Sequence, residues 1–201
     1  SATASTTYDV DNSCRFNKAD NAYHSKSLGT PTDADKFTIS FWMKLGLVSS
    51  TVRTIFNIAV SGGANTFMQL TAADLMVFGR YDSGYQGNLT TTQVFRDPSA
   101  WYSIIVVYDS GNATAGNRMR LYVNGTEVTS FGTDTNPDQD LDSSNVSGAT
   151  FFVGAYGDDD EEFDGYLAEF CFIDGLALTP SSFGEFNEDT PTVFQPIDVS
   201  G

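Results

Sequence analysis

Histidine, cysteine and basic residues are scarce in this sequence, and each shortage argues against a class of function. The chain has 201 residues, with one histidine, two cysteines and 10 lysines and arginines. A catalytic triad would have to use His24, and no motif places a nucleophile beside it. Zinc has no cluster of cysteine and histidine ligands. The 26 acidic residues bring the net charge to −16, which disfavours partners made of nucleic acid or anionic lipid.

Long apolar runs and helical periodicity are missing as well. No stretch approaches the roughly 20 apolar residues that a membrane helix needs, so we expect no membrane insertion. The chain starts at Ser1 without a charged segment that leads into an apolar one, so no signal peptide is visible. No helical period occurs before Thr179, where Pro180 in the first helical position predicts a short helical turn over Ser181–Phe186.

Alternating apolar residues and frequent turns dominate the rest of the sequence. Residues 37–43 alternate between two faces, and residues 104–108 are apolar on both faces, which predicts a central strand. Asn124 and Gly125 form the strongest two-residue hairpin signal, with a return strand over residues 127–129. Turn signals recur about every ten residues, a spacing typical of a β-sandwich or barrel. The length is that of one all-β domain.

Several longer motifs occur in a fixed order. The last third has an aromatic strand, an acidic loop and a long terminal strand that ends in Ala177-Leu178-Thr179-Pro180. Four further motifs precede it along the chain, at residues 13–17, 37–44, 92–102 and 120–125. Together they resemble the concanavalin A-like, laminin G-like jelly-roll domains over residues 13–188. The resemblance is closest to the versions in marine phage virion proteins.

This resemblance implies an all-β fold, namely a two-sheet antiparallel β-sandwich of the concanavalin A-like jelly-roll type with a short helical turn near the C-terminus. The first and last strands should pair. We expect an N-terminal arm over residues 1–12, the sandwich over 13–188 and a C-terminal tail over 189–201. Strand alternation places Cys14 and Cys171 on opposite faces, which predicts two free thiols. We expect Trp42 and Trp101 to pack in the core or against a sheet.

A glycosidase on this fold would carry two carboxylates that flank the scissile bond. The laminarinase-type signature is Glu-x-Asp-x-x-Glu on one strand. The nearest match is Glu162-Phe163-Asp164, which lacks the third carboxylate. We therefore expect no catalytic residues and no enzymatic activity.

Calcium is the metal to consider, because carboxylates crowd one loop and calcium prefers oxygen ligands. The candidates in this loop are Asp158, Asp160 and Glu162. The resemblance adds Glu169 and Asp174, since relatives often hold a structural calcium near the terminal strand. The alternative is a solvated acidic loop. We expect that no cofactor is required, with calcium as the ion such a site could hold.

Glycan binding is favoured by one projecting turn. Lectins stack aromatic rings on sugars and use amides and carboxylates on the hydroxyl groups. The candidate glycan-binding residues of this turn are Tyr81, Asp82, Tyr85, Gln86 and Asn88, and Tyr156 with the acidic loop is a second candidate. The alternative is that these tyrosines only cover the edge of a sheet.

We therefore hypothesise a non-enzymatic phage virion surface protein, either a head decoration or a tail-fibre component, that binds host-surface glycans. Such a protein would be made in the host cytoplasm and reside in the virion. Its partners would be other virion proteins and glycans, and it could form a homo-oligomer. The alternative hypothesis is an extracellular bacterial carbohydrate-binding module or adhesin assisted by calcium.

Overall fold

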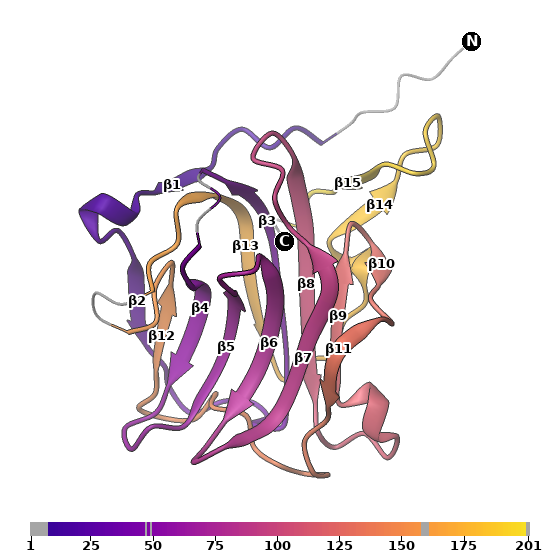
Figure 1. The fold of residues 1–201 in the computed structure, drawn as a ribbon. Coiled ribbons are helices and arrows are strands. Elements are labelled where there is room, and N and C mark those ends of the chain that lie inside the picture. Colours follow the sequence, from indigo (N-terminus) through magenta and orange to yellow (C-terminus); the bar gives the residue numbers. More distant parts are fainter. Residues whose placement is uncertain (1–7, 47, 49, 158–160, 200–201) are drawn as a thin grey trace.

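The computed structural model describes residues 8–46, 48, 50–157 and 161–199, which form two antiparallel sheets packed face to face (Figure 1). The six-stranded sheet has the order β1 (Cys14–Phe16), β13 (Gly165–Asp174), β3 (Lys36–Leu45), β8 (Trp101–Asp109), β9 (Met119–Val123) and β10 (Thr126–Glu127). The seven-stranded sheet has the order β11 (Phe131–Thr135), β7 (Tyr85–Val94), β6 (Leu75–Tyr81), β5 (Asn65–Leu70), β4 (Arg53–Ala59), β12 (Thr150–Val153) and β2 (His24–Ser27). The predicted fold class is confirmed.

The core lies between the two sheets and follows from strand alternation. On β3 the side chains of Phe37, Ile39, Phe41 and Met43 all point inward and have no exposed surface. Strand β8 pairs with β3 on one side and β9 on the other, and residues 104–107 are buried on both faces. The expectation of a central strand here is confirmed.

The hairpin between β9 and β10 also forms as predicted. Asn124 and Gly125 both have positive φ, at 49° and 76°, and Thr126 pairs with Val123. Positive φ at both positions gives the tight turn the twist that antiparallel strands need.

The first and last strands of the sandwich pair, as the resemblance implies. Cys14 on β1 lies opposite Leu167 on β13, whereas Cys171 lies opposite Ser40 on β3. Leu167 points into the core, and Cys171 packs against the apolar cluster on the outer face. Both cysteines are free, so the expectation of two free thiols is confirmed.

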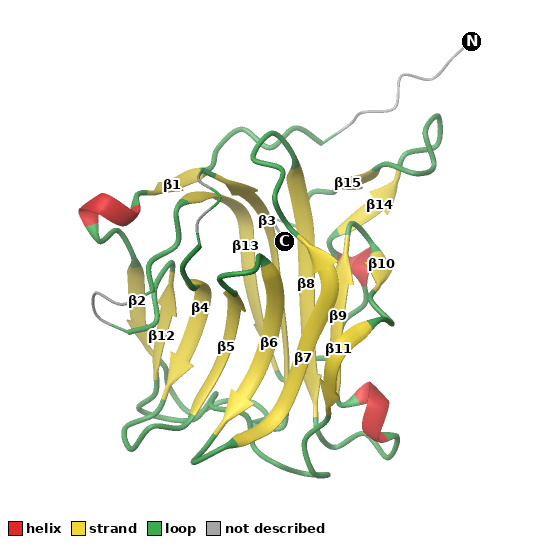
Figure 2. Cartoon of the chain, viewed as in Figure 1, coloured by secondary structure: helices red, strands yellow, loops and turns green. Residues whose placement is uncertain are grey.

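Helical structure in the described residues is limited to short 3-10 turns, which Figure 2 shows between strands. These are η1 (Lys18–Asp20), η2 (Ala115–Asn117) and η3 (Pro180–Ser182). None of the helices in the described ranges has the length and apolar character of a membrane span.

The helical turn predicted over Ser181–Phe186 is shorter than expected. It ends at Ser182, and Gly184–Phe186 instead forms strand β14, which pairs with β15 (Phe194–Pro196). A Cβ atom at Gly184 would lie 2.5 Å from the ring of Phe194, so the strands meet where only glycine fits. Cross-strand packing thus prevails over continuation of the helix.

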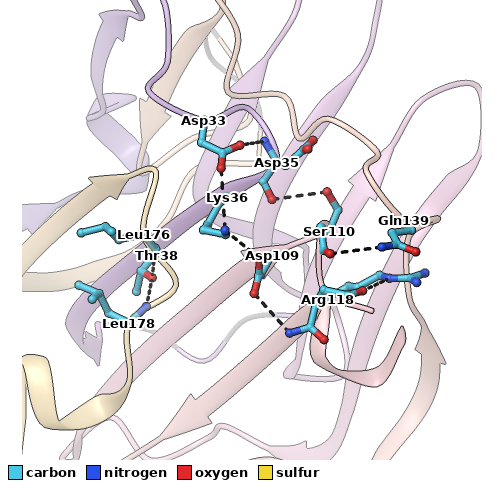
Figure 3. A network of polar contacts seen from close by, with 12 residues as sticks. Asp33, Asp35, Lys36, Thr38, Asp109, Ser110, Arg118, Gln139, Leu176 and Leu178 are labelled. Atoms are coloured by element: carbon cyan, nitrogen blue, oxygen red, sulfur yellow. Dashed lines mark hydrogen bonds and ion pairs between the residues drawn. The ribbon is translucent and has the colours of Figure 1, made fainter. Parts of the chain in front are cut away.

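The C-terminal segment covers the outer face of the six-stranded sheet. Ile105, Val107 and Tyr122 point outward and are buried by Phe183 together with Leu178 and its neighbours. Thr38 fixes the start of this cover, because its hydroxyl donates to the carbonyl of Leu176 and accepts from the N–H of Leu178 (Figure 3). These two bonds measure 2.7 Å and 2.9 Å.

A second part of the same polar network ties loops together beside β3 (Figure 3). Lys36 forms an ion pair with Asp109 at 3.4 Å, and the Ser110 hydroxyl donates to the carbonyl of Asp35. Burial raises the pKa of the Asp35 carboxyl, and the adjacent carboxyl of Asp142 raises it further. These contacts hold the loop before β3 against the loop after β8 at one end of the sandwich.

Candidate functional site

A pair of tyrosines marks the hairpin between β6 and β7. Arg80 pairs with Gly87, but the next pair is Tyr81 with Tyr85, so Gln86 is an extra residue in β7. A bulge of this kind re-aims the side chain that follows the break in pairing. It brings Tyr85 against Tyr81, with ring centroids 5.5 Å apart and the rings edge to face. Both residues remain partly exposed, Tyr81 at 37% and Tyr85 at 52%.

Phe67 extends this pair into an aromatic platform on the outer face of the seven-stranded sheet. Phe67 on β5 lies opposite Gly79 on β6, and a Cβ atom at Gly79 would approach the Phe67 ring to 2.5 Å. The missing side chain therefore lets the ring lie over the neighbouring strand. Phe67 contacts Tyr85 on one side and Tyr156 on the other, with centroid distances of 6.4 Å and 6.1 Å.

The platform forms one wall of a cleft of about 270 Å³. Its lining residues are Phe67, Gln69, Tyr81, Tyr85, Tyr156 and Glu161. Three of the predicted glycan-binding residues therefore meet in one place, although Tyr156 comes from a segment far away in the sequence.

Gln69 and Glu161 give the cleft its polar side. The amide of Gln69 donates to the carboxylate of Glu161 and to the hydroxyl of Thr54, the latter at 3.0 Å. The backbone N–H of Thr54 also donates to the carbonyl of Glu161 at 2.7 Å. Because these bonds fix the carboxylate and the amide, the polar groups are held in place before a ligand arrives.

The other predicted glycan-binding residues lie beside the cleft without lining it. Asp82 and Gln86 are exposed near the tip of the hairpin, where the Gln86 amide donates to the carbonyl of Asp82 at 3.3 Å. Asn88 lies opposite Gly79 and accepts from the hydroxyl of Thr90 at 2.8 Å.

Sequence reasoning missed Phe67 and Gln69, and it considered Glu161 only as part of the acidic loop that follows Tyr156. The alternation of Phe67 and Gln69 along β5 could have indicated that they share an outward face. Their approach to Tyr156 depends on how β4, β5 and β12 pair, and no local sequence signal gives that register.

The predicted calcium ligands do not gather among the described residues. Asp158 and Asp160 lie outside the described residues, and Glu162 is buried where it forms a β-bridge with Thr54. Elsewhere in the described ranges, no three histidine, cysteine, aspartate or glutamate side chains form a possible metal site.

Two of the predicted calcium ligands already accept hydrogen bonds. Glu169 accepts from the hydroxyl of Tyr8 at 3.3 Å. Asp174 accepts from the backbone N–H of Thr32 and from the amide of Asn145, the latter at 2.8 Å. Asp174 therefore joins two loops to the end of β13.

The residues considered for catalysis also have structural partners. His24 is exposed on β2, with Nε2 3.4 Å from the Sγ of Cys14. Asp164 forms an ion pair with Arg15 at 2.9 Å. Within the described part of the chain, Glu161 is the one carboxylate that lines the tyrosine cleft.

Both tryptophans lie on the outer face of the six-stranded sheet rather than in the core. Phe41 and Met43 point inward, so Trp42 between them points outward, where it stacks on Phe194 with centroids 6.3 Å apart. Trp101 at the start of β8 is 38% exposed. Of the two expectations, packing against a sheet is confirmed for Trp42, whereas packing in the core is wrong because strand alternation places both residues on the outer face.

Comparisons with known proteins agree with this architecture. Residues 17–182 match the family model described as the concanavalin A-like lectin/glucanases superfamily. No curated protein sequence matches the chain.

Solved structures share the fold at low sequence identity. A heptameric SAP-like pentraxin from Limulus polyphemus superposes with a TM-score of 0.56 and 17% identity, over 82% of this chain and 77% of that one. Domains LG4-5 of the mouse laminin alpha1 chain superpose with a TM-score of 0.54 and 14% identity, over 89% of this chain and 47% of that one. The CBM40 of the Ruminococcus gnavus IT-sialidase, bound to alpha2,3 sialyllactose, superposes with a TM-score of 0.50 and 15% identity, over 78% of this chain and 91% of that one.

Proposed function

The chain belongs to the concanavalin A-like lectin/glucanases superfamily, and from this premise we propose that it is a non-catalytic carbohydrate-binding domain. Its site would be the cleft formed by Tyr81, Tyr85 and Tyr156. The observation that carries the proposal is the convergence of these three rings, from separate segments, with Gln69 and Glu161. The sialidase module with the same fold, which was solved bound to alpha2,3 sialyllactose, supports it.

The chemistry of the cleft suits a sugar. A pyranose ring has an apolar face of C–H groups, which an aromatic ring can cover, and a rim of hydroxyl groups. Hydroxyl groups can donate to a carboxylate and to an amide oxygen, the acceptors that Glu161 and Gln69 provide, because the N–H donors of Gln69 are already engaged by Thr54 and Glu161. A small pocket with apolar walls and a few fixed polar groups is the usual form of a ligand site.

The ligand should be a neutral glycan rather than a sialylated one. No lysine or arginine of the described residues lines the cleft. Arg80 beside Tyr81 is turned away, with its guanidinium bonded to the carbonyls of Tyr81 and Asp142 at 2.7 Å and 3.1 Å. A carboxylate on the ligand would therefore meet Glu161 and the acidic protein without a cation to pair it.

The carboxylates in the described part of the cleft support the proposal of non-catalytic binding. Glycoside hydrolysis uses two carboxyl groups on opposite sides of the bond, about 5–10 Å apart. In the described part of the cleft there is one, and Gln69 already engages it. This arrangement can hold a sugar but provides no acid and nucleophile pair.

The location of the protein stays a prediction that rests on the motifs of the sequence. Display on a phage virion, with other virion proteins as partners, would present many copies of one weak site. Many linked sites raise avidity well above the affinity of each one. The calcium-assisted bacterial module remains the alternative.

The test is binding of the purified chain to an array of matched neutral and sialylated glycans, in calcium and in EDTA. We expect binding to neutral glycans in both arms, and a loss of about tenfold in Tyr85→Ala, which is about 1.4 kcal/mol. Tyr166→Ala is the matched control, because Tyr166 is also exposed but stacks with Arg15. No binding in either arm would overturn the proposal, and loss in EDTA would favour the calcium-assisted alternative.

A further inference from the structure

A second cleft with aromatic walls lies on the outer face of the six-stranded sheet. Trp42 on β3 is opposite Ser103 on β8, and Trp101 is opposite Lys44, so the two tryptophans are diagonal neighbours on one face. Diagonal neighbours in a sheet are roughly 7–8 Å apart, within reach of large aromatic side chains. The two indoles thus flank one depression.

This cleft opens where the C-terminal cover ends. On one side the ring of Phe194 stacks on Trp42 and Pro196 lines the opening. On the other side the segment Val10–Ser13 forms a wall. The volume of this open cleft is about 360 Å³, within the usual range for a small-ligand pocket.

Polar residues line this depression. Asp11, Asn12 and Ser13 are exposed at the cleft, and no hydrogen bond among the described residues uses their side chains. Polar side chains beside aromatic rings are the combination that the tyrosine cleft also presents. Trp101 keeps 38% of its surface exposed, so part of the indole remains available.

We propose that this tryptophan cleft is a second sugar-binding site, one that holds a neutral pyranose unit independently of the tyrosine cleft. The indoles would cover the C–H face of the ring, and Asp11 and Asn12 would bond to its hydroxyl groups. An anionic ligand is disfavoured by Asp11 and by the net charge of −16. An organic cation is disfavoured because Lys44 lies on the same face, directly opposite Trp101.

The consequence is that one chain would bind glycans on both outer faces of the sandwich. The tyrosine cleft lies on the seven-stranded sheet and the tryptophan cleft on the six-stranded sheet. Such a domain could cross-link two glycan chains. Display of many copies would raise the avidity further, because the sites are then linked.

Intrinsic tryptophan fluorescence tests this proposal, because the chain has two tryptophans and both line this cleft. The whole chain is titrated with methyl glycosides of glucose, galactose and mannose, with glucuronate and choline as charged probes. We expect a saturable change in emission with at least one neutral glycoside and none with the charged probes. The change should persist in Tyr85→Ala, which alters only the tyrosine cleft.

Two variants localise the response. Asn12→Ala removes an exposed polar group, and Trp101→Ala removes one indole while Trp42 still reports. Each should weaken binding by about tenfold. An unchanged affinity in both would overturn the proposal, as would no response to any neutral glycoside or a response to choline alone. A response that disappears in Tyr85→Ala would place the sugar in the tyrosine cleft, and one that follows self-association in sedimentation would assign the face to a second copy.

Discussion

The two outer faces of this sandwich differ in what covers them. On the six-stranded sheet, Ile105, Val107 and Tyr122 point outward and lie under the C-terminal segment. On the seven-stranded sheet, Gln69 and Thr90 occupy outward positions, and the tyrosine cleft is open beside them. Apolar residues on both sides of β8 require a cover, whereas polar residues on the second face tolerate water. The open face can therefore serve a ligand without a cover, and on the covered face the tryptophan cleft opens where the C-terminal cover ends.

The largest effect should come from breaking the cover. Phe183→Ala removes a buried ring that packs on Ile105 and Tyr122, and such deletions cost about 3–5 kcal/mol of unfolding free energy. Urea unfolding measures this loss. Tyr85→Ala on the open face is the comparison and should change stability by less than about 1 kcal/mol. Equal losses of unfolding free energy in the two variants would contradict the idea that only the six-stranded face needs its cover for stability.

A change at a turn should lower stability without touching either face. Asp74 forms ion pairs with the buried Arg53 and with Arg96. Burial alone would raise the pKa of Asp74, but hydrogen bonds and charge from the two arginines outweigh it and lower that pKa. Asp74→Asn removes the carboxylate that pairs with the buried Arg53 and should cost about 3 kcal/mol at neutral pH.

The same ion pair predicts a pH dependence. Because the pKa of Asp74 is lower in the folded state than in the unfolded state, its contribution is present above the ordinary value of about 3.9. It is lost as the pH falls through the lower folded pKa. Urea midpoints measured from pH 7 down to pH 2 should fall less steeply for Asp74→Asn than for the wild type. Parallel curves would contradict this account.

A smaller loss should follow from loosening the start of the cover. Thr38→Val keeps the shape of the side chain but leaves the N–H of Leu178 and the carbonyl of Leu176 without their partner. We expect a loss of about 1–3 kcal/mol. Hydrogen exchange at the Leu178 amide should accelerate, while amides in β5 and β6 keep their protection. Unchanged exchange at Leu178 would show that Thr38 does not hold the segment.

The smallest effect on stability, and the largest on binding, should come from the open face. Gln69→Ala removes the amide that holds Glu161, at a half-buried position on β5. We expect stability to change by less than about 1 kcal/mol and glycan affinity to fall by about tenfold. Gln93→Ala, an exposed glutamine at the far end of β7, is the matched control in the same binding assay.

Strand alternation explains what the sequence could predict. It put Phe37, Ile39, Phe41 and Met43 on one face of their strand, and it put Cys14 and Cys171 on opposite faces. The same rule applied to Trp42 would have shown that it points outward, since its neighbours point inward. The helical turn was overestimated because the pairing of Gly184 with Pro196 is a contact between distant residues.

The tyrosine cleft depends on features that alternation does not give. The turn at Asp82–Gly84 and its tyrosines were visible in the sequence. The bulge at Gln86 that brings Tyr85 against Tyr81 breaks the alternation, so local pattern alone would misplace the ring. The approach of Tyr156 and Glu161 depends on sheet order, which only the folded chain establishes.

The most direct test of glycan binding on the open face is chemical-shift mapping of the isotope-labelled chain during titration with a neutral glycan selected on the array. The account predicts that the largest shifts fall on Phe67, Gln69, Tyr81, Tyr85, Tyr156 and Glu161. Shifts confined to other residues of the seven-stranded sheet, or to the face that the C-terminal segment covers, would contradict it.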